Sequence, residues 1–287
     1  MDIIEKIKNL DRRIIFLLIF LAVAIPIIVP IGLPVKPSPI VQRGYDAVET
    51  LDSDSVVLVS FDYDPSAEPE LYPMSVAMIK HLMKKRARII TMALWPAGAK
   101  LAEDALKEGV AYMEQEEKYT PQYGMDYANI GFMAGGLIVM TSIGKSLPRT
   151  FPADFYKTPV ETLPIMKGVE NYSNIDMVIT LSAGDPGVPY WVMVAATSYG
   201  KDLIGGCTAV SAPQLYPYVQ SGQLLSLIGG LKGAAEYETL AMVPAKATKG
   251  MDSQSIAHLM IVILIIIGNI TFFVEKQRLK KLKKRIK

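Results

Sequence analysis

Ser-Val-Val-Leu-Val-Ser-Phe-Asp-Tyr, at residues 55–63, is the stretch that decides the fold. It is a nearly continuous apolar run of strand length that ends in polar residues, which is typical of a strand buried in a parallel sheet. Asp64-Pro65-Ser66 breaks the run, and a helix is predicted over 72–85. One face of that helix collects its apolar and aromatic positions: Met74, Ala77, Met78, His81 and Leu82.

The alternation of strand and helix continues along the chain. Further apolar strands are predicted at 86–95, 175–181 and 203–210, with a short one at 130–133. Alternating strands and helices predict one α/β domain with a mostly parallel sheet of four to five strands, in a three-layer flavodoxin-like or Rossmann-like arrangement. Helices are predicted at 99–109, 137–145, 188–199 and 218–242, and a long loop at 112–127.

Two charge-free runs of membrane-spanning length flank this domain, at 14–35 and 253–274. Pro26, Pro30 and Pro34 predict that the first helix kinks or unwinds after about Ile25. The predicted organisation is a cytoplasmic N-terminus (1–13), a proline-kinked transmembrane segment (14–35), a linker (36–50), an extracytoplasmic α/β domain (51–245), a second linker (246–252), a second transmembrane segment (253–274) and a basic cytoplasmic tail (275–287). Within the first linker, residues 41–50 fit either a short helix or an irregular linker.

Charge is distributed unevenly along the 287 residues. The net charge of +2 divides into +1 for residues 1–13, +7 for residues 275–287 and −6 for the rest. Basic residues beside a membrane segment stay in the cytoplasm, so both termini are predicted inside and the domain outside. The tail is expected to attract anionic lipid headgroups in the bilayer rather than nucleic acid, because no aromatic residues interrupt its charges.

The ends of the predicted strands supply the candidate ligand site. Ligands of open α/β sheets bind beyond the carboxyl ends of the strands, where polar side chains from several strands meet. No Gly-x-Gly-x-x-Gly follows the first strand, so no dinucleotide is indicated and the cofactor stays unassigned. The predicted ligand-binding residues are Asp62, Asp64, Trp95, Ser182, Gly184, Asp185 and Thr208.

Phe61-Asp62-Tyr63-Asp64 resembles the first motif of the haloacid-dehalogenase phosphatases. The resemblance implies Asp62 as a nucleophile, Asp64 as a general acid and a magnesium ion. The same Asp-x-Asp pattern is also common in turns and helix caps, and the sequence offers no downstream acidic pair for the metal. With only His81 and His258, the chain has no cluster of metal-ligand spacing, so no catalytic or metal residue is assigned. One cysteine, Cys207, excludes an internal disulfide.

Three kinds of residue indicate contact surfaces. Tyrosines on predicted loops supply area at low entropic cost, glycines in an apolar helix let a second backbone approach, and a polar residue in a membrane helix can bond a neighbour. They favour a non-catalytic scaffold or assembly protein that associates laterally with copies of itself, as a homo-oligomer, or with membrane partners. The alternatives are a small-molecule binding or sensing domain, for which 195–213 resembles the strand-and-turn pattern of periplasmic sugar-binding proteins, and a phosphatase-like hydrolase. The predicted interface residues are Tyr119, Tyr123, Tyr216, Tyr218, Leu225, Gly229, Gly230, Gly233 and Asn269.

Overall fold

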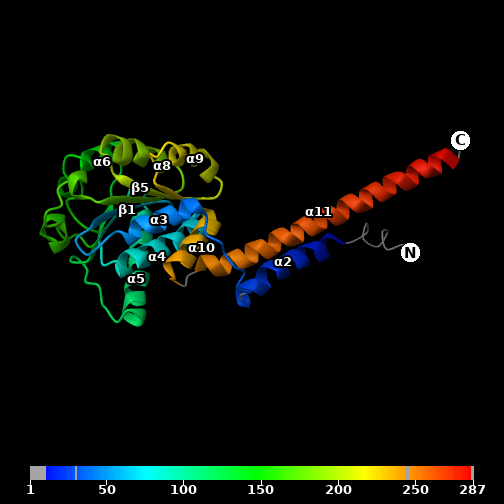
Figure 1. Ribbon diagram of the computed structural model, residues 1–287, viewed down its shortest axis with the longest axis horizontal. Helices are drawn as coiled ribbons and strands as arrows, with labels where there is room; N and C mark the ends of the chain where they lie inside the picture. Colours follow the sequence, from blue (N-terminus) through cyan, green and yellow to red (C-terminus); the bar gives the residue numbers. More distant parts are fainter. Residues whose placement is uncertain (1–10, 30, 244–245, 286–287) are drawn as a thin grey trace. The chain divides into compact units, whose positions relative to one another are not determined.

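The computed structural model describes residues 11–29, 31–243 and 246–285 (Figure 1). The described residues form two compact units. One is the α/β domain, Val35–Thr248, and the other joins the described residues of 1–34 to those of 249–287.

Six strands form the sheet of the α/β domain, in the order β3-β2-β1-β4-β5-β6, and each neighbouring pair is parallel. This order is that of the doubly wound Rossmann arrangement, whose strand sequence reverses direction between β1 and β4. The register aligns the strand ends there, with Asp62 opposite Ser182 and Ser182 opposite Cys207. The strands are β1 (Val56–Asp62), β2 (Arg88–Ala93), β3 (Tyr127–Phe132), β4 (Met177–Ser182), β5 (Asp202–Cys207) and β6 (Ser226–Gly229).

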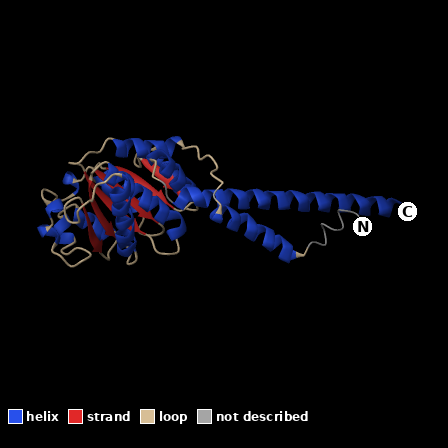
Figure 2. Ribbon diagram, turned by 90° about the horizontal axis from the view of Figure 1, so that it is seen from below, coloured by secondary structure: helices blue, strands red, loops and turns tan. Residues whose placement is uncertain are grey.

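Helices cover both faces of the sheet, as Figures 1 and 2 show. All seven residues of β1 are buried, because side chains that alternate along a strand enter a different helical layer on each face. Val56 and Leu58 belong to the core beneath α6, α8 and α9. One layer holds α3 (Pro39–Glu49), α4 (Glu68–Lys84), α5 (Gly98–Glu116) and α10 (Gly230–Ala241); the other holds α6 (Leu137–Ile143), α8 (Val188–Trp191), a π-helical segment (Val192–Ser198) and α9 (Ala212–Gln220).

The connection from β3 to β4 contains short helical pieces besides α6. Tyr172 lies buried within it, and its hydroxyl donates to the carbonyl oxygen of Met140 in α6 at 2.9 Å. The pieces are α7 (Leu147–Thr150) and the 3₁₀ turns Val160–Thr162, Pro164–Met166 and Tyr172–Asn174.

The sequence-based prediction of four to five strands was too low. β6 lies inside the segment predicted as one helix, 218–242, which is divided between α9, β6 and α10. A short apolar run such as residues 224–228 fits a buried strand as well as a helix, and Gly222 and Gly230 adopt positive φ angles on either side of it. The loop predicted at 112–127 is also shorter, because α5 continues to Glu116.

α3 lies in the segment predicted as the first linker. Its Val41 and Val48 are buried, and its Gly44 comes so close to β6 that an added Cβ would lie 2.5 Å from Ser226 Oγ. The α/β domain therefore includes this helix in its core.

The second unit contains α2 (Arg12–Ile28) and most of α11 (Lys246–Arg285). Among the described residues, one helix is long and apolar enough to cross a membrane, Lys246–Gln277, whose most apolar window has a mean hydropathy of 2.5. α2 has 17 residues, about 25 Å of helix, and ends just beyond Pro26. One candidate membrane helix is thus found where the sequence predicted two.

Asp252 of α11 holds the chain that follows α2. Its carboxylate accepts hydrogen bonds from the backbone N–H groups of Ile31, Gly32 and Leu33, at 2.9, 2.8 and 3.0 Å. These donors belong to no helix or strand, so the carboxylate satisfies polar groups that would otherwise need water. α11 itself is continuous through the predicted second linker, 246–252.

Candidate functional site

Asp62, at the end of β1, is fully buried, and protein donors occupy both of its carboxylate oxygens. Oδ1 accepts the backbone N–H of Leu94 at 2.8 Å, Oδ2 accepts the indole Nε1–H of Trp191 at 2.9 Å, and the Ser60 hydroxyl lies 2.8 Å from each oxygen. Burial raises the pKa of this carboxyl to about 6, and the hydrogen bonds from Trp191, Leu94 and Ser60 partly oppose the rise. Asp62 thus points into the core beneath the strand ends.

The other groups near Asp62 are likewise paired within the protein. Ser182 is buried, and its hydroxyl accepts the backbone N–H of Val188 at 3.0 Å, which fixes the start of α8. The indole of Trp95 donates to the carbonyl oxygen of Pro186 at 3.3 Å. Its ring covers Gly184, where an added Cβ would lie 2.9 Å from a ring carbon. The strand ends are therefore closed by their own loops.

The remaining predicted ligand residues lie on the surrounding loops. Asp64 accepts the backbone N–H and hydroxyl of Ser66, at 2.9 and 2.6 Å, in the turn before α4; these bonds lower its pKa. Asp185 is exposed beside the hydroxyl of Tyr190. The Thr208 hydroxyl lies 3.1 Å from that of Ser211 at the start of α9. Asp62, Trp95, Ser182 and Gly184 are thus brought together, whereas Asp64, Asp185 and Thr208 belong to separate turns.

The geometry of Asp62 disagrees with the phosphatase resemblance. An aspartate nucleophile needs an exposed carboxylate oxygen that can reach phosphorus, and both oxygens of Asp62 are buried and hydrogen-bonded. Within the described ranges, no group of three or more metal-ligating side chains comes together.

His81 and Cys207, the other groups with nucleophile or base chemistry, are also inside the domain. The Nδ1 of His81 lies 2.7 Å from the Tyr237 hydroxyl and its Nε2 lies 2.7 Å from Glu49, while Tyr45 stacks on the ring. Burial lowers the pKa of His81 and raises that of Cys207 to about 12. At neutral pH the thiol is protonated and therefore a poor nucleophile.

Several predicted interface residues pack within their own domain. Tyr119 lies under the guanidinium of Arg86, and the hydroxyl of Tyr123 donates to Asp154 at 2.8 Å. An added Cβ at Gly230 would lie 2.7 Å from Ala209, and one at Gly233 would lie 3.1 Å from Ile228, so these glycines serve packing inside the domain. Leu225 and Gly229 were expected on a helix. Leu225 instead precedes β6, Gly229 is the last residue of β6, and both are half-buried.

Tyr216, Tyr218 and Asn269 remain accessible in their respective units. Tyr216 is 42% exposed on α9. Tyr218, two residues later and half-buried, lines a groove of about 490 Å³ between α9 and the π-helical segment. Most of the lining is apolar or aromatic: Pro189, Tyr190, Val192, Met193, Thr197, Tyr218 and Gln223.

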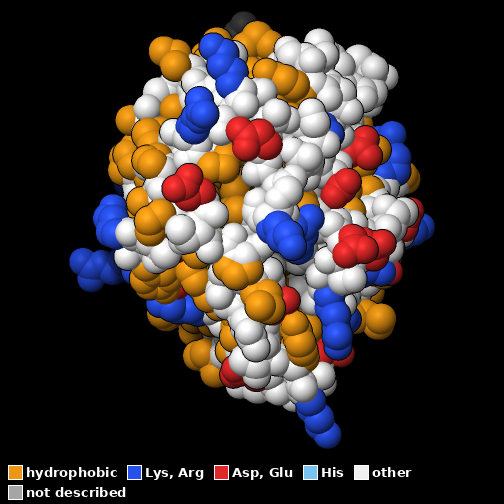
Figure 3. All heavy atoms as spheres, turned by 90° about the vertical axis from the view of Figure 1, so that its left-hand side faces the viewer, with side chains coloured by type: hydrophobic (Ala, Val, Ile, Leu, Met, Phe, Trp, Pro, Cys, Tyr) orange, Lys and Arg blue, Asp and Glu red, His pale blue; other side chains and the backbone are white. Residues whose placement is uncertain are grey.

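Charges are mixed on the face of the α/β domain shown in Figure 3, where basic and acidic side chains alternate with apolar ones. No broad basic surface covers this face. Such a mixture gives little long-range attraction for a polyanion at this face.

The chain has no detectable relative among the proteins compared. No protein-family model matches it, and neither a curated protein nor a solved structure shows significant similarity. Function must therefore be argued from the groups described above.

Sequence reasoning missed two accessible features. One is the groove beside Tyr218, whose π-helical wall carries no recognisable signature in residues 192–198. The other is a pocket on the helical pieces after β3, with Lys145 and Arg149 on its rim. Lys145 lies in the turn between α6 and α7 and Arg149 lies in α7, so no helical spacing in the sequence pointed to this pair.

Proposed function

We propose that this chain is a membrane-anchored, non-catalytic assembly protein whose α/β domain associates laterally with copies of itself. The observation that carries the proposal is the groove beside Tyr218. Apolar grooves with aromatic walls are typical of protein contact sites. Met193 is 46% exposed on its π-helical wall, and π-helical turns occur frequently at functional sites.

The membrane part of the proposal places both termini in the cytoplasm and the α/β domain outside. α11 supplies one candidate crossing. On α2, large apolar side chains stay exposed, with Phe16 at 67% and Ile28 at 77%, which favours apolar surroundings for this helix as well. The first segment then crosses as α2 together with the extended residues held by Asp252.

The strand ends support association over catalysis or ligand binding at that position. Their carboxylate, hydroxyl and indole groups are used to close the sheet, with Asp62 bonded to Trp191 and Leu94. A ligand at this place would have to break those hydrogen bonds, each of which contributes about 1.5–3 kcal/mol when a charged group takes part.

The deciding experiment measures the mass of the full chain in mild detergent by light scattering. We expect an oligomer, which Met193→Lys reduces toward the protomer by placing a charge in the groove. Met125→Lys is the matched control, because Met125 is 53% exposed and lies outside the groove. A monomeric wild-type protein, or an oligomer unaffected by Met193→Lys, would contradict the proposal.

The topology has a separate test. A tag fused to the C-terminus should be accessible to antibody only after the membrane is permeabilised, because the basic tail is expected inside. Labelling of the tag on intact cells would refute this orientation without bearing on the groove.

A further inference from the structure

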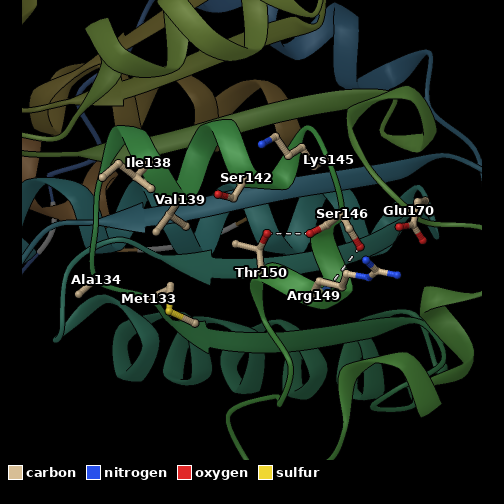
Figure 4. Close-up of a pocket in the computed structure, with 10 residues that line it drawn as sticks. All are labelled: Met133, Ala134, Ile138, Val139, Ser142, Lys145, Ser146, Arg149, Thr150 and Glu170. Carbon is tan, nitrogen blue, oxygen red and sulfur yellow. Dashed lines mark hydrogen bonds between the residues drawn. The ribbon is translucent and has the colours of Figure 1, made fainter.

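A second pocket, of about 620 Å³, opens beside α6 and α7, on the chain that follows β3 (Figure 4). Gly135 and Gly136, at φ angles of +136° and +48°, turn the chain sharply from β3 into α6. Glycine tolerates both conformations. The pocket wall is packed into the domain, because Val139 and Ser146 are buried. The backbone N–H of Leu147 also donates to the carbonyl oxygen of Glu170 at 2.7 Å, which joins two segments of the wall.

The pocket is chemically two-sided. Figure 4 shows Met133, Ala134, Ile138 and Val139 at one end, and Ser146, Arg149 and Glu170 at the other. Lys145 lies on the rim, and the hydroxyls of Ser142 and Thr150 lie between the two ends. A ligand that fits both ends has an apolar part joined to a polar head.

The charged groups of the polar end are available to a ligand. Within the part of the chain that the structure describes, the side chains of Lys145, Arg149 and Glu170 form neither an ion pair nor a hydrogen bond. The Ser146 hydroxyl accepts the backbone N–H of Arg149. This hydrogen bond fixes the backbone of Arg149 in α7, while its guanidinium stays free. Two cations against one carboxylate leave a local charge of +1.

We infer that this pocket binds a small organic monoanion, a carboxylate joined to a branched or linear hydrocarbon of a few carbons. The carboxylate lies on Arg149, because a guanidinium can hold both of its oxygens, and Lys145 adds positive charge at the pocket wall. The hydrocarbon lies against Ile138 and Val139. Glu170 limits the head to a single negative charge, since a phosphate dianion or polyphosphate would face like-charge repulsion.

The probe is 4-methylpentanoate, titrated by calorimetry into the full chain in lipid nanodiscs. We expect measurable binding, and acetate should bind at least tenfold more weakly, because each buried CH₂ contributes about a fourfold gain in affinity. Arg149→Gln should weaken binding about tenfold or more, as loss of a charge-assisted hydrogen bond does, and Lys145→Gln should weaken it by a smaller factor. Lys167→Gln is the control, since Lys167 is exposed and lies outside the pocket.

Two further variants separate the ends of the pocket. Ile138→Ser should weaken 4-methylpentanoate but leave acetate unchanged, because Ile138 is 75% exposed and contacts only the hydrocarbon. Glu170→Gln should strengthen both. These side chains are at the surface, so circular dichroism should show an unchanged fold.

Several outcomes would overturn the inference. No binding tighter than a Kd of about 1 mM would do so, as would wild-type affinity in both Arg149→Gln and Lys145→Gln. Tighter binding of leucine than of 4-methylpentanoate would assign the site to a zwitterion whose ammonium reaches Glu170. Tighter binding of inorganic phosphate would assign it to a phosphate group.

Discussion

The Asp62 carboxyl should make the stability of the α/β domain depend on pH. Its pKa in the folded protein is about 6 because burial disfavours the charged form. In the unfolded chain it returns to about 3.9. The folded state therefore holds this proton more tightly, so the free energy of unfolding is highest in acid and falls as the pH rises from about 4 to about 6.

The magnitude follows from the two pKa values. The full shift of about two units corresponds to about 3 kcal/mol, at 1.36 kcal/mol per unit. At about pH 4.5 roughly a third of that loss has already occurred, so about 2 kcal/mol remains to be lost by about pH 7.

The comparison variant is Asp62→Asn, which does not titrate. Asparagine presents one oxygen and one amide group, so its NH₂ must face either the N–H of Leu94 or the Nε1–H of Trp191. We expect it to be less stable in acid by about 1–3 kcal/mol, the cost of an unsatisfied buried donor. The stability difference between wild type and variant should then shrink by about 2 kcal/mol between about pH 4.5 and about pH 7.

Chemical unfolding of the full chain in detergent, followed by tryptophan fluorescence, gives both free energies. Trp191 is fully buried against Asp62 and reports directly on this site. His81 and Glu238 titrate identically in both proteins, so their contributions cancel. A stability difference that stays constant across this pH range would refute a raised pKa for Asp62.

Three other predictions follow from buried groups. Burial lowers the pKa of His81, so the unfolded state binds its proton first and stability is lost as the pH falls below about 6.5; His81→Gln should remove that acid dependence in the same unfolding assay. Gly98→Ala should lower the free energy of unfolding by several kcal/mol, because its Cβ would meet the carbonyl oxygen of Phe61, whereas Gly268→Ala, with no atom within 4 Å, should not. Cys207 should react with a thiol reagent only after unfolding, because its thiol is buried and protonated. A rapid reaction of the folded protein would contradict this.

The strands at the centre of the sheet could be predicted from sequence because burial on both faces gives each an uninterrupted apolar run. Residues 55–63 and 175–181 are the clearest cases, and they became the adjacent strands β1 and β4. β6 was missed because its four residues are too few to separate a strand from a helix by periodicity. Its pairing with β5 is a long-range contact that local sequence does not encode.

The meeting of polar residues at the strand ends could be predicted, but the direction in which their side chains point could not. Parallel strand ends do bring Asp62 and Ser182 into register. Asp62 accepts hydrogen bonds from Ser60, Leu94 and Trp191, and Trp191 lies 129 residues further along the chain. Only the folded packing shows that a polar residue at a strand end is directed inward and satisfied there.

The inward-pointing side chain of Asp62 also bears on which parts of the domain surface can bind a ligand or partner. In a doubly wound sheet the gap between β1 and β4 is the place where helices diverge and a ligand can enter. Here the buried Asp62–Trp191 hydrogen bond crosses this region, and Trp95 covers the adjoining loop at Gly184. These groups close that gap, and the accessible pockets lie instead on α6, α7, α9 and the π-helical segment. The groove beside Tyr218 and the pocket beside Arg149 both lie there, and each can be altered without touching the core that Asp62 holds together.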